Sequence, residues 1–153
     1  MTRVNPQHMA VPVKKKLRRL HQLLVNSRYA LERTSRLVPT AWLGDLLFML
    51  SCRRIIMLNE LDRELGRLHV PAKPPPEAAD HFRDFHASVP GPQRYVEVCE
   101  EEEAYLVREL ESLNREPGLH GHTRDAIAAL LRETRENLKD IGFLRENHPA
   151  LQN

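Results

Sequence analysis

The chain has 153 residues, of which 41% are hydrophobic and 29% are charged, and its formal net charge is +2. This composition predicts one soluble globular domain and excludes a disordered chain. A net charge so close to zero provides no global basic field for holding nucleic acid. No apolar run approaches the roughly 20 residues that a membrane-spanning helix requires.

The first half of the chain predicts two long helices. Residues 1–12 contain Pro6 and Pro12 and are expected to form a flexible N-terminal arm. A helix is predicted over 13–37, where it stops before Pro39, and a second over 41–68, with Thr40 as its N-cap. Their apolar positions recur at helical spacing: Leu17, Leu20, Leu24 and Leu31 in the first, and Leu43, Leu47, Leu50, Met57, Leu61 and Leu68 in the second.

A proline-rich segment, residues 69–91, then interrupts the helical pattern. Within it, Glu77–Ala87 can form a short helix that packs Phe82 and Phe85 on the rest of the domain. At roughly 3.3 Å per residue, the segment is long enough to run the length of the preceding helix, which at 1.5 Å per residue is about 40 Å.

Two further helices are predicted over 92–115 and 123–147, with Thr123 as the N-cap of the last one. A C-terminal tail, 149–153, follows Pro149. The inward positions are expected to be the following: Val96, Cys99, Glu103, Leu106, Leu110 and Leu113 in the third helix, and Ile127, Leu131, Thr134, Leu138, Ile141 and Leu144 in the fourth.

The charge pattern indicates how these helices are arranged. Residues 1–36 carry nine Lys or Arg and one acid, whereas residues 91–118 carry eight acids and three Arg. Short turns make the first two and the last two helices antiparallel pairs. If the long connection crosses the bundle, the basic first helix lies beside the acidic third. We therefore predict an all-α domain over 13–148, a four-helix bundle with a long proline-broken crossover at about 69–91.

Several local phrases support a family resemblance. They are Leu20–Ala30 in the first helix, Glu60–Leu61, Leu65–Gly66 and Pro71 at the end of the second, and Cys99–Glu100, Glu103, Tyr105 and Leu110 in the third. Together with the helix order, they resemble a bacterial ferritin-like family of unknown function, in the same broad structural group as rubrerythrin. The resemblance implies a ferritin-like fold over most of the chain, and it brings no established activity.

The position of Glu103 is the most unusual feature of the sequence, because a carboxylate stands there in an otherwise apolar helix stripe. Inward carboxylates build di-metal sites in helical bundles, but such sites also need Glu-x-x-His pairs, and the chain contains none. A buried acid is otherwise expected to pair with a cation. We therefore predict a structural ion pair of Glu103 with Arg54 or Arg28. Glu100 and Glu103 remain candidate ligands for iron or manganese.

Other candidate sites have more ordinary interpretations. The basic run Lys14–Arg19 can contact nucleic acid or an anionic membrane, but it lacks interleaved aromatic residues and is expected to be a helix face. His81 and His86, and also His120 and His122, lack further ligands at zinc spacing. Cys52 and Cys99 are expected to be free thiols, and Trp42 and Phe48 to pack on the crossover or a second subunit.

These observations favour a non-enzymatic bundle that acts through association with itself or with a protein partner. No cofactor and no small-molecule substrate are predicted. The alternatives are a metal-binding or redox bundle that uses the carboxylates of 92–115, and a binding module that uses the basic first helix. With no signal peptide recognisable, the cytoplasm is the expected compartment, and the resemblance suggests a bacterial protein with a role in stress response.

Overall fold

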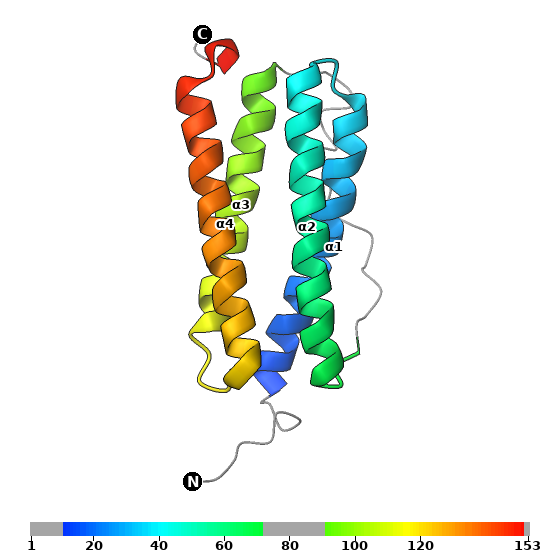
Figure 1. The fold of residues 1–153 in the computed structure, drawn as a ribbon, viewed down its shortest axis with the longest axis vertical. Coiled ribbons are helices and arrows are strands. Elements are labelled where there is room, and N and C mark those ends of the chain that lie inside the picture. The colour runs from blue at the N-terminus through cyan, green and yellow to red at the C-terminus, as the bar shows by residue number, and fades with distance from the viewer. Residues whose placement is uncertain (1–10, 72–90, 152–153) are drawn as a thin grey trace.

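The structure is a computed structural model that describes residues 11–71 and 91–151. These residues form α1 (Val11–Leu37), α2 (Ala41–Arg67), α3 (Pro92–Asn114) and α4 (Gly121–Asn147), and a single 3₁₀ turn, η3 (Pro149–Leu151), ends them (Figure 1). No strand occurs in the described ranges. The prediction of an all-α, four-helix architecture is confirmed.

The helices form two antiparallel hairpins that lie side by side (Figure 1). α1 packs on α2 and α3 packs on α4, while α1 also contacts α3 and α2 also contacts α4. α2 and α3 run in the same direction, so α2 ends at one end of the bundle and α3 begins at the other. Most of the predicted connection, with the expected helix over 77–87 and the histidines His81 and His86, lies outside the described residues.

Ion pairs join the basic α1 to the acidic α3, as the charge pattern predicted. The Lys16 ammonium pairs with Glu116 and donates a hydrogen bond to the Ser112 hydroxyl (Nζ–Oγ 3.0 Å). Arg19 lies 3.4 Å from a Glu109 carboxylate oxygen and donates to the Tyr105 hydroxyl at 2.7 Å. Exposed pairs of this kind each stabilise a fold by less than about 1 kcal/mol. Their main effect is therefore to favour α3 over other neighbours of α1.

The core consists of two apolar clusters at different heights in the bundle. The first gathers residues from the start of α1, the end of α2, the end of α3 and the start of α4, among them Leu17, Leu20, Leu24, Met57, Leu61, Leu106, Leu110, Ile127 and Leu131. The second gathers residues from the opposite end, among them Leu31, Leu43, Leu47, Leu50, Val96, Cys99, Ile141 and Leu151. A layer of polar side chains lies between them in the sequence of every helix: Ser27, Arg54, Glu103 and Thr134.

Two helix starts differ from the prediction. α1 begins at Val11, so Pro12 lies in its first turn, where the missing N–H would have no intrahelical partner in any case. α4 begins at Gly121, whose φ of 53° suits a glycine, and its N-cap is His120. Thr123 is therefore not the N-cap that we predicted. It lies inside the first turn of α4, and its hydroxyl donates a hydrogen bond to the Glu64 carboxylate of α2. Thr40 is the N-cap of α2, although its side chain makes no capping hydrogen bond.

The end of the bundle at which α4 finishes is closed by ring and side-chain packing. The indole of Trp42 stacks on the imidazole of His148, with ring centroids 4.3 Å apart and planes inclined by 26°. η3 contacts α3 and α4, and its Leu151 is buried in the second cluster. Part of the segment predicted as a tail thus packs on the core, and Trp42 has a partner in its own chain that the sequence did not indicate.

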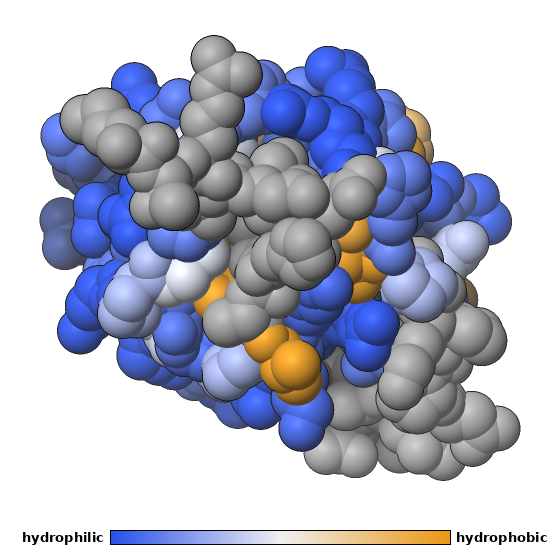
Figure 2. Space-filling model, turned by 90° about the horizontal axis from the view of Figure 1, so that it is seen from below, coloured by the Kyte–Doolittle hydropathy of each residue, from blue (hydrophilic) through white to orange (hydrophobic). Residues whose placement is uncertain are grey.

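The end of the bundle at which α1 begins has a mainly polar surface. Viewed from the end at which α1 begins, hydrophilic side chains dominate the described surface, and hydrophobic ones show in small patches (Figure 2). Among the described helices, none combines the length and the apolar character needed to cross a bilayer.

Two helical glycines test how closely α1 packs on α2. A Cβ at Gly142 would have no neighbour within 4 Å, so we expect Gly142→Ala to stabilise the fold by about 0.5–1 kcal/mol through helix propensity. A Cβ at Gly44 would lie 3.0 Å from the Ser35 carbonyl oxygen, so Gly44→Ala should give no gain or a loss. Urea denaturation measures both, and an equal gain at the two sites would contradict this account of the α1–α2 packing.

Candidate functional site

The candidate site is the polar layer of the core, and its centre is an ion pair between Arg54 and Glu103. Both side chains are buried, with 1% and 0% of their surfaces exposed. Arg54 Nη2 donates a hydrogen bond to Glu103 Oε1, and Arg54 Nε donates to the Ser27 hydroxyl at 3.0 Å. The pair thus joins side chains of α1, α2 and α3 at mid-height.

The helix patterns explain why these charges point inward. Arg54 occupies the position between the buried residues Leu50 and Met57 of α2, and Glu103 the position between Cys99 and Leu106 of α3. Positions three or four apart share one helix face, so both charges are held in the core by the apolar residues around them. α2 and α3 are not principal neighbours in the bundle. The two helices lie diagonally across the bundle, and a long arginine side chain can span the distance between them.

The hydrogen bonding of this pair is asymmetric. Arg54 uses Nε and Nη2, and its Nη1 lies 3.9 Å from the Met57 sulfur. Glu103 Oε2 is buried and has no hydrogen-bond partner within the described part of the chain. Because desolvating an ion costs several kcal/mol, the carboxylate depends mainly on the guanidinium of Arg54.

Arg28, the other predicted partner, occupies a different environment. Its guanidinium carbon lies 5.2 Å from the ring centroid of Tyr29, a cation–π distance, and its carbonyl oxygen accepts a hydrogen bond from the Ser51 hydroxyl at 3.3 Å. The structure therefore brings Glu103 to Arg54, and Arg28 makes its contacts around the α1–α2 hairpin.

The two candidate metal ligands, Glu100 and Glu103, have different partners. The Glu100 side chain is 30% exposed and accepts a hydrogen bond from Arg145 Nε of α4 at 2.6 Å. This contact also raises the pKa of the Arg145 guanidinium above its usual value. Glu103 faces the core and Arg54. A cation shared by the two carboxylates would have to displace an arginine from each of them.

The other helices supply no further metal ligand at the depth of Glu103. Ser27 accepts from Arg54, and the Thr134 hydroxyl donates to the Leu130 carbonyl oxygen of its own helix at 2.7 Å. Among residues 11–71 and 91–151, no three His, Cys, Asp or Glu side chains gather closely enough to hold a metal ion. The layer is therefore suited to charge pairing across the bundle.

A second buried carboxylate, Glu64 of α2, is not among the inward positions that the sequence predicted. Its side chain is 2% exposed, and it accepts a hydrogen bond from the Thr123 hydroxyl at 2.7 Å. The His122 ring nitrogen Nδ1 lies 2.5 Å from the same carboxylate, and Arg67 lies 3.6 Å from it. The residues that bury Glu64 are in the sequence Gly-His-Thr at 121–123. They are far from Glu64 in the chain and contact it only in the folded bundle.

The cysteines are free thiols in unlike environments. Cys99 is buried in the second cluster, and Cys52 is half-buried on α2. Burial, assisted by the nearby carboxylates of Glu102 and Glu103, raises the pKa of the Cys99 thiol far above its usual value. A thiol that stays protonated is a poor nucleophile, so Cys99 is a packing residue.

Comparison with known proteins gives this chain no relative. No family model matches it, and neither the curated proteins nor the solved structures contain a match.

The ion pair can be tested by removing one partner. Glu103→Leu leaves Arg54 buried without its counter-ion and should destabilise the fold by about 3–5 kcal/mol. Glu103→Ala should cost more, since it adds a cavity. The double variant Arg54→Met/Glu103→Leu should recover most of the loss, because no buried charge remains. Urea denaturation of these variants measures the free energy of unfolding, and a double variant no more stable than Glu103→Leu would contradict the pairing.

The thiols can be distinguished by alkylation. With iodoacetamide at neutral pH, we expect Cys52 to be labelled faster than Cys99 in the folded protein, because burial both shields Cys99 and keeps it protonated. Peptide mass spectrometry assigns the modified residue. Equal labelling of the two thiols in the folded state would show that the core around Cys99 opens readily.

Proposed function

We propose that this protein is a non-catalytic bundle of ferritin-like architecture whose role is protein association. The observation that supports it most directly is the Arg54–Glu103 pair, because a guanidinium occupies the middle of the core, opposite the only inward carboxylate of the layer formed by Ser27, Arg54, Glu103 and Thr134. In di-metal bundles this central position is built from carboxylates and histidines that converge from facing helices.

The arrangement of the helices supports the ferritin-like part of the proposal. A bundle of this type joins two antiparallel hairpins by one long crossover connection. Here α2 and α3 run parallel, and α2 ends at the end of the bundle opposite to the start of α3 (Figure 1). The proline-rich residues between them would supply the crossover.

The ion pairs in the structure give less support to the alternative functions. A metal or redox site built on Glu100 and Glu103 would compete with Arg145 and Arg54 for the same carboxylates. A nucleic-acid or membrane contact by the basic run of α1 would compete with α3, because Lys16 and Arg19 already pair with Glu116 and Glu109. Association through the surface requires no rearrangement of these contacts.

The cellular setting belongs to the proposal as well. A buried and a half-buried free cysteine suit a reducing compartment, which supports the cytoplasm. A bacterial source and a role in stress response rest only on the family resemblance.

Metal binding provides the decisive test of the non-catalytic assignment. We expect protein purified without chelator or affinity tag to contain iron and manganese well below one equivalent, and calorimetric titration with Fe²⁺ or Mn²⁺ to show no stoichiometric binding. The matched variant Arg54→Ser removes the competing cation and serves as the comparison. Near-stoichiometric metal in the wild-type protein would overturn the proposal and make Glu100 and Glu103 ligand candidates again.

A further inference from the structure

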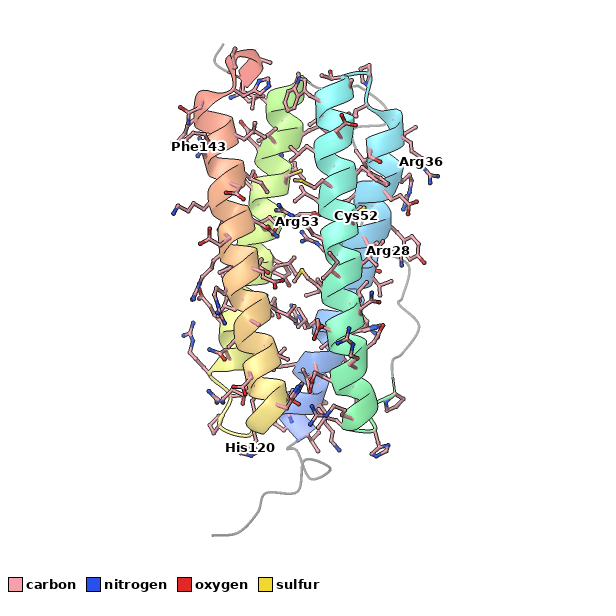
Figure 3. The ribbon with its side chains drawn as sticks, viewed as in Figure 1. Arg28, Arg36, Cys52, Arg53, His120 and Phe143 are labelled. Atoms are coloured by element: carbon pink, nitrogen blue, oxygen red, sulfur yellow. The ribbon has the colours of Figure 1, made fainter. Side chains whose placement is uncertain are left out.

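The outward face of α2 carries an apolar patch without a partner among the described residues. We define the α2 patch as Phe48, Met49, Cys52, Ile55 and Ile56. The side chains of Phe48, Met49 and Ile56 are exposed, at 54%, 40% and 59%, and Cys52 and Ile55 are half-buried. Figure 3 places Cys52 midway along α2. Large apolar side chains clustered on a surface mark an interaction site more often than scattered ones do.

Charges of opposite sign lie at the two ends of this patch. Asp45 stands nine residues before Arg54, and Arg63 stands nine residues after it. Nine residues are about two and a half turns, so both lie on the side of α2 opposite to the inward-facing Arg54. Both are exposed. Along the outward side of α2, the order is therefore an acid, an apolar patch and a base.

This order is self-complementary under a twofold rotation. If a second α2 packs antiparallel on the first, with the axis at the level of Arg54, Asp45 faces Arg63 of the second copy, and Arg63 faces its Asp45. The same rotation places Cys52 opposite Ile56 of the second copy. It places Phe48 and Met49 opposite Glu60 and Asn59 of that copy, so the apolar centre is formed by the two Cys52–Ile56 contacts. A twofold interface repeats each contact, so one acid and one base per chain give two ion pairs around an apolar centre.

We propose that the α2 patch binds a second copy of this chain, as an antiparallel twofold dimer with Asp45–Arg63 ion pairs at its ends. This inference rests on the proposed function, association, and names its partner and surface. The adjoining groove between α2 and α4 is lined by Arg53, Ile56, Arg132, Glu136 and Asp140 among others. Mixed charges beside an apolar centre match the usual anatomy of an interface, with its polar rim.

A second copy fits better than an unrelated partner because the acid and the base of one copy face the base and the acid of the other. An unrelated protein would need an acid and a base at the same separation, in the reverse order, with an apolar centre between them. The chain already carries that arrangement. The spacing of Asp45 and Arg63 is about 27 Å along the helix, which also fixes the register of the two copies.

Sedimentation velocity of the full chain tests the patch. We expect the wild-type protein to be a dimer at micromolar concentration, and Phe48→Glu and Ile56→Glu to raise the dissociation constant at least ~100-fold. Ile56→Glu places two carboxylates in the apolar centre of the dimer, and Phe48→Glu places each new carboxylate opposite Glu60 of the second copy. Phe143→Glu is the matched control, since Phe143 is an aromatic residue that is 69% exposed and lies on the side of α4 away from α2 (Figure 3). It should leave the dimer unchanged.

Charge exchange tests the antiparallel register. Asp45→Arg and Arg63→Asp should each weaken the dimer about tenfold or more, because each creates two like-charge contacts. The double variant Asp45→Arg/Arg63→Asp should restore the dissociation constant to within about threefold of wild type. Circular dichroism melts establish that all the variants remain folded, as exposed positions allow.

Thiol cross-linking gives an independent readout of the same register. The two Cys52 residues would lie about 6 Å apart along the helix direction, so a short bismaleimide should link them, and Cys52→Ser should abolish the product. A wild-type monomer, a dimer that survives Ile56→Glu, or a double charge variant no tighter than its single parents would each overturn the inference. The metal test decides the proposed function separately.

Discussion

The bundle depends on how one pair of opposite charges is accommodated in the middle of a mainly apolar core. Arg54 and Glu103 are buried completely, so removing either one leaves the other as an uncompensated buried ion. Hydrophobic side chains can pack in many registers, whereas a guanidinium and a carboxylate satisfy each other in very few. The pair is therefore less a source of net stability than a constraint on which arrangement of α2 and α3 is allowed.

The surface charges determine which helices lie next to each other. Lys16 and Arg19 of α1 meet acids of α3, so the first hairpin accepts the second in one relative placement. The exposed pairs select neighbouring helices, and the buried pair sets their height. The Glu64 contact with Thr123 adds a link between the end of α2 and the start of α4. Each helix is thereby tied to at least one helix outside its own hairpin.

The sequence predicted the parts of this structure that depend on periodicity. Leucine spacing locates the four helices to within two residues of the observed bounds, and the same spacing turns Glu103 inward and names Arg54 as a partner. Features that depend on tertiary contacts between distant residues were not predictable. The burial of Glu64 was not predicted, because periodicity cannot show that the start of α4 covers it. Thr123 was predicted as a cap from its residue type, but its hydroxyl donates to Glu64 of α2, and the stacking of Trp42 on His148 depends on how α4 ends.

The polar layer also divides the interior. Apolar residues on one side of Ser27, Arg54, Glu103 and Thr134 form one cluster, and those on the other side form a second. Mutations act independently when they share no partners, so substitutions in one half should leave packing in the other half largely untouched. Such a core is modular in evolutionary terms. Either half can accept changes in side-chain volume one at a time, while the charged layer keeps the helices in register.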